Sequence, residues 1–258
     1  MGKRVLVITG PTATGKTALG VELALRLGGE VVSADSMQVY RGLDIGTAKV
    51  TAEEARGVPH HLVDVAPPGE EFSVARWVEA AAEAVEDILA RDKAPIIAGG
   101  TGLYIDSLLS GRDFAGRGGG ALREELDAQY DEIGGDAFRE KLRGIDPDRA
   151  EKLHPGDKKR LVRAMEVYLL TGETITAHDE RTRALPPRWD SLRVARSYSD
   201  RAALYARIDR RVESMVRDGL FGEVKALLSG GLSPDSTAMQ AIGYKEAARF
   251  LRGELSED

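Results

Sequence analysis

A phosphate-binding loop is the first feature of this sequence that indicates chemistry. Eight consecutive residues fit the pattern G-x-x-x-x-G-K-[ST]: Gly10, Pro11, Thr12, Ala13, Thr14, Gly15, Lys16 and Thr17. In such a loop the glycines let backbone N–H groups turn toward phosphate oxygens, the lysine adds a positive charge and the last hydroxyl binds Mg²⁺. The alternative is a glycine-rich turn followed by an ordinary surface lysine.

The flanking residues favour the phosphate-binding loop. Residues 4–9 form a short apolar run typical of a strand, and residues 18–27 have helical periodicity that ends at Gly28 and Gly29. Strand, loop and helix in this order are the context that the motif requires.

Asp35 follows a second predicted strand, residues 30–34. Ligands of open parallel sheets lie beyond the carboxyl ends of the strands, so Asp35 is expected to face the same crevice as the loop. It is a candidate general base or Mg²⁺ partner. The alternative is an aspartate that caps a helix or shapes a turn.

A third predicted strand, residues 94–98, leads into Gly99, Gly100 and Thr101. Glycines here allow the backbone to approach a ligand closely, and the hydroxyl of Thr101 would project into the crevice. Three strand ends are therefore expected to form one active site. Before this strand, Ser73 is expected to begin a helix whose apolar side belongs to the core. The neighbouring His60 and His61 point to opposite sides of an extended chain, so we interpret them as structural or as lining the cleft.

Residues 113–190 are expected to form a helical insertion in an α/β core made of residues 1–112 and 191–258. A glycine-rich joint at residues 116–120 begins the insertion, and the segment after it is polar and poor in strand formers. Within it, Lys159, Arg160 and Arg163 share one side of a predicted helix. They form either a stripe that contacts phosphates or a solvated face.

A strand at residues 192–195 is followed by a helix that Asp200 caps. Its apolar positions are expected to face inward: Leu204, Ile208, Val212, Met215 and Val216. Arg207 and Arg211 lie one turn apart on this helix, which suits a diphosphate.

Composition excludes several classes of protein. The 258 residues include no cysteine, so disulfides and thiolate metal sites are absent. No signal peptide or membrane-spanning run is evident, and we expect a cytoplasmic monomer. The net charge of −6 does not favour nucleic-acid binding, yet residues 154–217 carry 14 Lys and Arg against 9 Asp and Glu, which permits an RNA partner.

Several stretches together resemble the tRNA dimethylallyltransferase family, also called tRNA isopentenyltransferases. Besides the phosphate-binding loop, the matching stretches are residues 33–42, 44–49, 59–62, 99–104 and 241–246. They follow the family's order along nearly the whole chain. The resemblance implies an α/β, P-loop NTPase-like fold: a parallel sheet flanked by helices, with an all-helical insertion.

The activity implied by the resemblance is transfer of a dimethylallyl group from dimethylallyl diphosphate to N6 of the adenine 3′ of a tRNA anticodon. Asp35 matches the family's general base, and Thr101 matches a central residue that meets tRNA and diphosphate. Lys16, the loop N–H groups, Mg²⁺ on Thr17 and Arg207 would neutralise the leaving diphosphate. Asp35 is a further candidate for the Mg²⁺ site.

The tRNA contacts implied by the resemblance fall in three segments and at Arg123. They comprise Asp35, Ser36, Met37, Gln38 and Thr101, then Lys159, Arg160, Leu161, Val162 and Arg163, and finally Gln240, Ala241, Ile242, Gly243, Tyr244 and Lys245. The partner would be a tRNA anticodon stem-loop whose adenine is flipped into the cleft. Family members usually continue beyond the position of Asp258 with a basic segment, but the expected catalytic groups all precede it.

Three other functions share parts of this pattern. An isopentenyltransferase acting on free adenine nucleotides has the same loop and the same use for Asp35, although the basic helical insertion does not favour it. A small-molecule kinase would hold ATP in the loop. A non-catalytic RNA-binding module would not need Lys16, Thr17 and Asp35 in one crevice.

Overall fold

A computed structural model of the chain describes residues 4–111, 114 and 120–255. The chain divides into two compact units. We call Met1–Leu109 with Arg188–Asp258 the core unit and Ser110–Pro187 the helical unit. Most of the predicted glycine joint, residues 116–119, lies outside the described residues. In the part of the chain that is described, no helix is long and apolar enough to cross a membrane.

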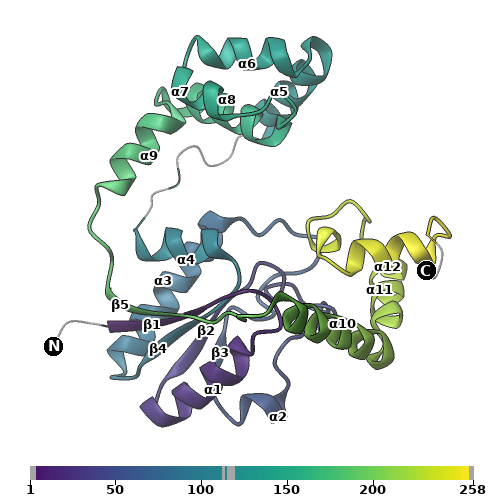
Figure 1. The fold of residues 1–258 in the computed structure, drawn as a ribbon. Coiled ribbons are helices and arrows are strands. Elements are labelled where there is room, and N and C mark those ends of the chain that lie inside the picture. Colours follow the sequence, from purple (N-terminus) through teal and green to yellow (C-terminus); the bar gives the residue numbers. More distant parts are fainter. Residues whose placement is uncertain (1–3, 112–113, 115–119, 256–258) are drawn as a thin grey trace. The chain divides into compact units, whose positions relative to one another are not determined.

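A five-stranded parallel sheet forms the centre of the core unit (Figure 1). Its strands are β1 Arg4–Thr9, β2 Glu30–Ala34, β3 His60–His61, β4 Pro95–Gly99 and β5 Asp190–Ala195, in the order β3-β2-β4-β1-β5. The strands that the sequence predicted at the phosphate-binding loop and before Asp35 have the predicted bounds. Both pair with β4, since Leu6 and Val31 are each in register with Ile96. The carboxyl ends of β1, β2 and β4 therefore lie side by side.

The two histidines form the short edge strand β3, which sequence periodicity could not reveal because it has two residues. His60 pairs with Val31, near the start of β2, and the His61 ring lies 2.8 Å from a carboxylate oxygen of Glu30. They belong to the end of the sheet opposite Asp35. His60 and His61 are therefore structural residues and do not line the cleft.

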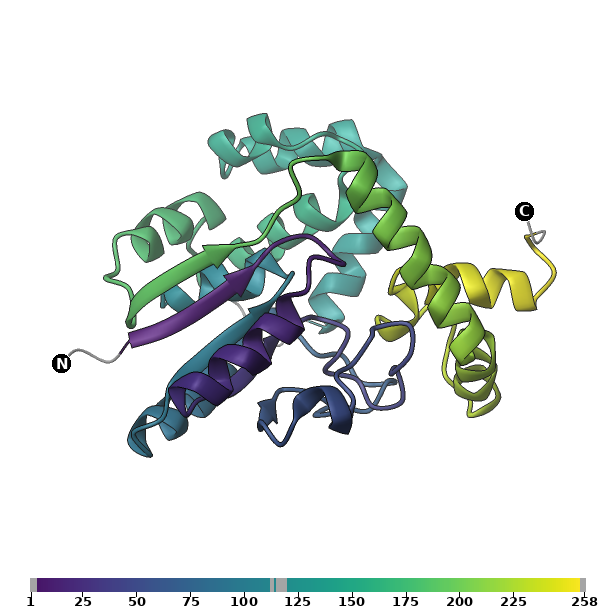
Figure 2. The same cartoon turned by 60° about the horizontal axis from the view of Figure 1, so that its bottom comes forward.

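Helices cover both faces of the sheet (Figure 2). The core unit contains α1 Lys16–Leu27, α2 Ala52–Ala55, α3 Val74–Ala90, α4 Gly102–Leu109, α10 Arg201–Asp218, α11 Leu220–Ser229 and α12 Tyr244–Leu251, with a 3-10 turn at Ala238–Gln240. On one face, Val21 and Ala24 of α1 pack with Ile96. The predicted cap of α3 is confirmed, because the Ser73 hydroxyl accepts a hydrogen bond from the N–H of Arg76 at 3.3 Å. The buried Trp77 of α3 donates to the Ser33 carbonyl at 3.2 Å, which holds this helix against β2.

The predicted inward face of α10 is confirmed only in part. Leu204, Ile208 and Met215 are half-buried, whereas Val212 and Val216 are 49% and 43% exposed, and no residue of the helix is fully buried. Met215 lines a pocket beside residues 44–54 together with the polar residues Arg211, Ser214 and Asp218. The side of α10 that faces the rest of the core unit is therefore rotated toward Arg211 and more polar than predicted.

The helical unit has a core of its own. Its helices are α5 Gly120–Ile133, α6 Gly135–Arg143, α7 Pro147–Lys152, α8 Lys158–Thr171 and α9 Ile175–Arg183. Apolar side chains of the first four helices, with Leu153 directly after α7, form one cluster: Leu126, Phe138, Leu142, Ala150, Leu153, Leu161, Val162, Ala164 and Met165. Gly172 ends α8 in the left-handed conformation, as the sequence predicted.

Candidate active site

A pocket of about 300 Å³ lies at the carboxyl ends of β1, β2 and β4. Its lining comprises all eight residues Gly10 to Thr17, and also Asp35, Gln38, Thr47, Ala48, Ala98, Gly99, Gly100 and Arg211. The three strand ends that the sequence singled out therefore meet in one place.

The phosphate-binding loop has its shape because glycine occupies its tightest positions. Gly10 has φ 143°, and a Cβ there would collide with the carbonyl oxygen of Arg196. Gly15, at φ 76°, directly precedes the first residue of α1. The first-turn N–H groups of a helix have no partner within the helix and attract anions, so this loop can bind phosphate oxygens.

Lys16 is partly buried beside the pocket. Its ammonium donates to the carbonyl of Pro11 at 2.7 Å. Burial lowers its pKa, while the nearby Asp35 opposes that shift and Arg211 adds to it. An anion entering the pocket would relieve the electrostatic strain between the two cations.

Asp35 uses one carboxylate oxygen to shape the turn after β2. Its Oδ1 accepts hydrogen bonds from the N–H groups of Met37 at 2.9 Å and Gln38 at 3.3 Å. Its Oδ2 accepts none from the described part of the chain. One oxygen of Asp35 therefore shapes the turn, as the second interpretation expects, and the role of the other oxygen as a base or Mg²⁺ ligand stays a prediction.

Thr101 ties the end of β4 to the end of β2. Its hydroxyl accepts a hydrogen bond from the Ser36 N–H at 3.2 Å, and its own N–H donates to the Ala34 carbonyl at 3.1 Å. A Cβ on Gly99 would collide with this same carbonyl, so only glycine permits the approach. Thr101 does not itself line the pocket and lies one residue beyond Gly100, the last lining residue of this segment.

Gln38 closes another side of the pocket. Its amide nitrogen donates to the carbonyls of Thr47 and Ala48 at 3.1 and 3.3 Å, and its amide oxygen accepts from the Ser33 hydroxyl at 3.0 Å. These bonds attach the loop after Gly42 to the turn that carries Asp35.

Arg211 is the cation of α10 that reaches the pocket, whereas Arg207 is exposed and does not line it. Burial lowers the pKa of Arg211, and Asp35 and Glu54 oppose that shift. An arginine remains charged at any physiological pH, so Arg211 adds a permanent positive charge. Arg207 was the arginine expected to neutralise the diphosphate, but the rotation of α10 about its axis leaves Arg207 exposed and turns Arg211 toward the loop.

The pocket offers two donors for a metal ion, the hydroxyl of Thr17 and the carboxylate of Asp35. Within the described residues, no group of three or more His, Cys, Asp or Glu could hold one. Mg²⁺ usually keeps several waters and binds through one or two protein groups together with substrate phosphates. The donor set fits Mg²⁺ that arrives with a diphosphate.

The segment Gln240–Lys245 precedes and begins α12. Ile242 is 93% exposed, while Tyr244 is fully buried and Ala241 is 5% exposed. Gln240 and Lys245 are exposed as well. Side-chain contacts with a partner would therefore come from Gln240, Ile242 and Lys245.

The candidate RNA-contacting residues of the helical unit fall into two groups. Leu161 and Val162 are 0% and 2% exposed and belong to the core of the unit, so their side chains do not reach a partner. Lys159 and Arg160 are exposed. Arg163 and Arg123 both donate to Glu166 at 2.6 Å. Burial disfavours the charge of Glu166, but the two guanidiniums outweigh this effect and hold its pKa below the usual range.

Comparisons with known proteins agree on one family. The family model described as IPP transferase matches residues 38–258. The tRNA dimethylallyltransferase of Thermoanaerobacter sp. (strain X514) is 44% identical over 99% of this chain and 82% of its own length, and that of Exiguobacterium sp. is 48% identical over 98% and 80%. The full-length tRNA isopentenylpyrophosphate transferase from Bacillus halodurans superposes with a TM-score of 0.69 at 41% identity, covering 99% of this chain and 79% of that one. A eukaryotic dimethylallyltransferase, described as acting on tRNA, gives a TM-score of 0.82 at 31% identity, covering 98% and 64%.

The parallel sheet, with a pocket at the carboxyl ends of its strands, defines a P-loop-like α/β protein. The match over residues 38–258 and the relatives of 44–48% identity narrow this class further. The chain belongs to the tRNA dimethylallyltransferase (IPP transferase) family.

Proposed function

We propose that this protein transfers the dimethylallyl group of dimethylallyl diphosphate to N6 of the adenine 3′ of a tRNA anticodon. The observation that carries the proposal is the pocket that joins the phosphate-binding loop to Asp35. The loop suits the diphosphate, and the Asp35 carboxylate in the same pocket is suited to take the proton that the amine nucleophile loses. In the reaction, the bond between the allylic carbon and diphosphate oxygen breaks, the N6–carbon bond forms, and one proton leaves N6.

Asp35 is the proposed general base. The lone pair of an adenine amine is drawn into the ring, so the amine is a weak nucleophile whose proton must be removed during attack. With Oδ1 held by the N–H groups of Met37 and Gln38, Oδ2 is the oxygen that takes this proton. Thr101 is proposed to stand beside the reacting groups and to keep Ser36 in place.

The diphosphate is proposed to lie against the N–H groups of residues 10–17, with Lys16 and Arg211 neutralising the charge that develops on it. Lys16 would exchange the Pro11 carbonyl for a phosphate oxygen. Arg207, one turn earlier on α10, is proposed as an outer cation. Thr17 is proposed to hold Mg²⁺, with Asp35 as a further candidate ligand, and the ion would supply Lewis-acid stabilisation of the leaving diphosphate.

The tRNA is proposed to contact both units. A stacked adenine cannot reach this pocket, so the base would flip out of the anticodon loop into it. Residues 35–38 and Thr101 would meet the base, and exposed side chains of Gln240–Lys245 would meet neighbouring nucleotides. Arg123, Lys159, Arg160 and Arg163 of the helical unit would contact phosphates.

The test is a transfer assay with labelled dimethylallyl diphosphate and Mg²⁺. Unmodified tRNA with an adenine at the target position and free AMP are offered in parallel. Label on tRNA at N6 is the expected result. Label on AMP instead would assign the activity to the free-nucleotide class of isopentenyltransferase.

A second arm of the assay addresses phosphate transfer. The protein is incubated with γ-labelled ATP in place of dimethylallyl diphosphate, and phosphorylated products are sought. Phosphate transfer without prenyl transfer would overturn the proposal in favour of a kinase.

A further inference from the structure

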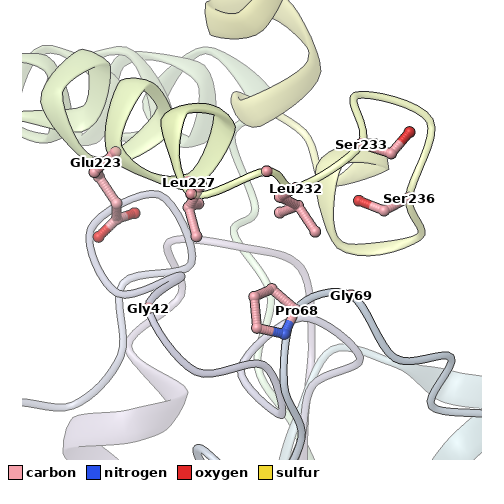
Figure 3. A pocket seen from close by; sticks show the side chains of 11 residues that line it. Gly42, Pro68, Gly69, Glu223, Leu227, Leu232, Ser233 and Ser236 are labelled. Atoms are coloured by element: carbon pink, nitrogen blue, oxygen red, sulfur yellow. The ribbon is translucent and has the colours of Figure 1, made fainter.

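Glu223 lies in the first turn of α11, outside the pocket that contains Asp35, and bonds to the loop after Gly42. Its Oε2 accepts hydrogen bonds from the N–H groups of Asp44 at 3.0 Å and Ile45 at 2.9 Å. Its Oε1 accepts one from the N–H of Gly46 at 3.4 Å and another from the Tyr244 hydroxyl. Figure 3 shows Glu223 reaching from its helix toward the loop that includes Gly42, at the edge of a neighbouring pocket of about 660 Å³.

The loop fits closely against the two helices that hold it. A Cβ on Gly46 would collide with the ring of Tyr244 and would lie 2.9 Å from Cδ1 of Leu220. Tyr244 is fully buried. Burial and the hydrogen bond to Glu223 raise the pKa of Tyr244, so its hydroxyl remains a donor to the carboxylate.

The same loop reaches the active-site pocket at Thr47 and Ala48, directly after Gly46. The carbonyls of Thr47 and Ala48 accept hydrogen bonds from the amide nitrogen of Gln38. The backbone N–H of Gln38 in turn donates to Oδ1 of Asp35 at 3.3 Å. A continuous series of hydrogen bonds and short backbone segments thus runs from Glu223 through residues 44–48 and Gln38 to Asp35.

We infer that Glu223 is a positioning residue, which orients Asp35 for proton removal by fixing residues 44–48 and, through them, Gln38. The inference rests on the proposed function. Glu223 touches neither substrate, and its effect is on the rate of the chemical step. Because Tyr244 belongs to the segment proposed to contact tRNA, Glu223 also joins that segment to the wall of the pocket.

A carboxylate is needed at this position because four donors converge on it. A glutamine has one amide oxygen and would turn its NH₂ group toward backbone N–H groups, leaving some of them without an acceptor. Unpaired donors in a packed loop cost free energy, so the loop would move to reach water. Glu223→Gln therefore keeps the size of the side chain while releasing the loop.

The first experiment measures single-turnover transfer with both substrates saturating. Glu223→Gln is expected to lower this rate by about tenfold or more, since misplacing a catalytic group by about 1 Å can cost as much as 100-fold. The KM for dimethylallyl diphosphate should stay near that of the wild type. Tyr244→Phe, which removes one of the four donors and keeps the ring against Gly46, should have a smaller effect.

Glu30→Gln is the matched control. Glu30 also accepts several hydrogen bonds, from Arg91, Lys93 and His61, but it lies at the opposite end of β2 from Asp35. Both variants should melt at a lower temperature. If Glu223→Gln melts lower but transfers at the wild-type rate, Glu223 is merely structural and the inference is wrong.

A double-mutant cycle tests the route through Gln38. If Glu223 acts through Gln38, the double variant Glu223→Gln/Gln38→Ala should transfer about as slowly as the slower single variant. Multiplication of the two single effects would show that they act independently and would overturn the proposed route.

Hydrogen exchange separates this inference from the proposed function. In Glu223→Gln the amides of residues 44–49 and of Met37 and Gln38 should exchange faster, while those of β1 and β4 should not. This readout needs no transfer activity, so it decides the positioning role even if the wild-type protein modifies neither tRNA nor AMP. Unchanged exchange at Met37 and Gln38 would contradict the inference.

Discussion

The hydroxyl of Thr101 accepts a hydrogen bond from the backbone N–H of Ser36 at 3.2 Å, although 65 residues separate them in the sequence. This bond joins the segment after β4 to the turn that carries Asp35. The proposed base is consequently held from two directions, by Thr101 on one side and by Gln38 on the other. Such support from neighbouring groups keeps a catalytic side chain in its productive position.

Thr101→Ala should lower the transfer rate by about 10- to 100-fold, because small displacements of reacting groups have effects of this size. Thr101→Ser retains a hydroxyl that can accept from Ser36 and should stay within a few-fold of the wild type. The comparison is made by single-turnover transfer to tRNA. Equal losses in the two variants would mean that the methyl group, and not the hydrogen bond, matters.

Asp35→Asn should abolish most of the transfer while leaving diphosphate binding intact. The amide oxygen can still accept from Met37 and Gln38, so the turn persists, but the amide cannot take a proton. General bases typically contribute about 100- to 10,000-fold to a rate. Calorimetry with inorganic pyrophosphate and Mg²⁺ measures binding, and Lys16→Ala is the reference for weakened binding. Loss of pyrophosphate affinity in Asp35→Asn as well would make Asp35 a binding or structural residue.

Features that depend on neighbouring residues could be predicted from the sequence. The phosphate-binding loop, the strand at residues 30–34 and the cap at Ser73 each follow from a few consecutive side chains. The meeting of β1, β2 and β4 at one pocket also followed, because parallel strands present their carboxyl ends at the same edge of the sheet.

Features that depend on how one helix or loop packs against another could not be predicted from the sequence. The rotation of α10 decides whether Arg207 or Arg211 reaches the pocket, and helical periodicity alone allowed either. The residues next to Glu223 in the sequence do not indicate its role, since its partners Asp44 and Ile45 are 179 and 178 residues away. Such contacts exist only once the whole core unit is assembled.

Arg211→Ala should weaken pyrophosphate binding more than Arg207→Ala does. Arg211 lines the pocket and is partly buried, where a charge interacts more strongly than at the exposed position of Arg207. We expect about a 10-fold loss or more for Arg211→Ala, in the range of charge-assisted hydrogen bonds. Calorimetry at fixed Mg²⁺ measures both variants. A larger loss for Arg207→Ala would restore that residue as the principal ligand.

Arg160→Ala should weaken tRNA binding and reduce its dependence on salt. The side chain is 70% exposed on α8 and pairs with Asp157 at 3.2 Å, so it can turn to a phosphate. Each lost phosphate contact lowers the slope of log K against log salt by about 0.7 to 0.9. Arg143→Ala, which removes a half-exposed arginine of α6 that pairs with Glu140, is the control. Identical slopes for Arg160→Ala and the wild type would remove Arg160 from the RNA surface.

Glu30 should make the stability of the core unit depend on pH. Its side chain is 3% exposed, and Arg91, Lys93 and His61 surround it. The hydrogen bond from Arg91 outweighs burial and, with Lys93 and His61, holds the pKa of Glu30 well below its ordinary value of 4.5. Since the folded pKa is the lower one, the stabilisation is fully present above about 4.5 and is lost as the pH falls toward the folded pKa.

Glu30→Gln should therefore lower the free energy of unfolding by about 3 kcal/mol at pH 7, as expected when one partner of a buried ion pair is removed. The difference from the wild type should shrink as the pH falls from about 5 to about 3, because Glu30 in the unfolded wild-type chain then binds a proton that Glu30 in the folded protein does not. Urea unfolding followed by tryptophan fluorescence measures it, since Trp77 and Trp189 both belong to the core unit. Glu53→Gln, at an exposed position of α2, is the control and should leave the curve unchanged. A difference between Glu30→Gln and the wild type that stays constant from pH 7 to pH 3 would show that packing, not charge, makes Glu30 stabilising.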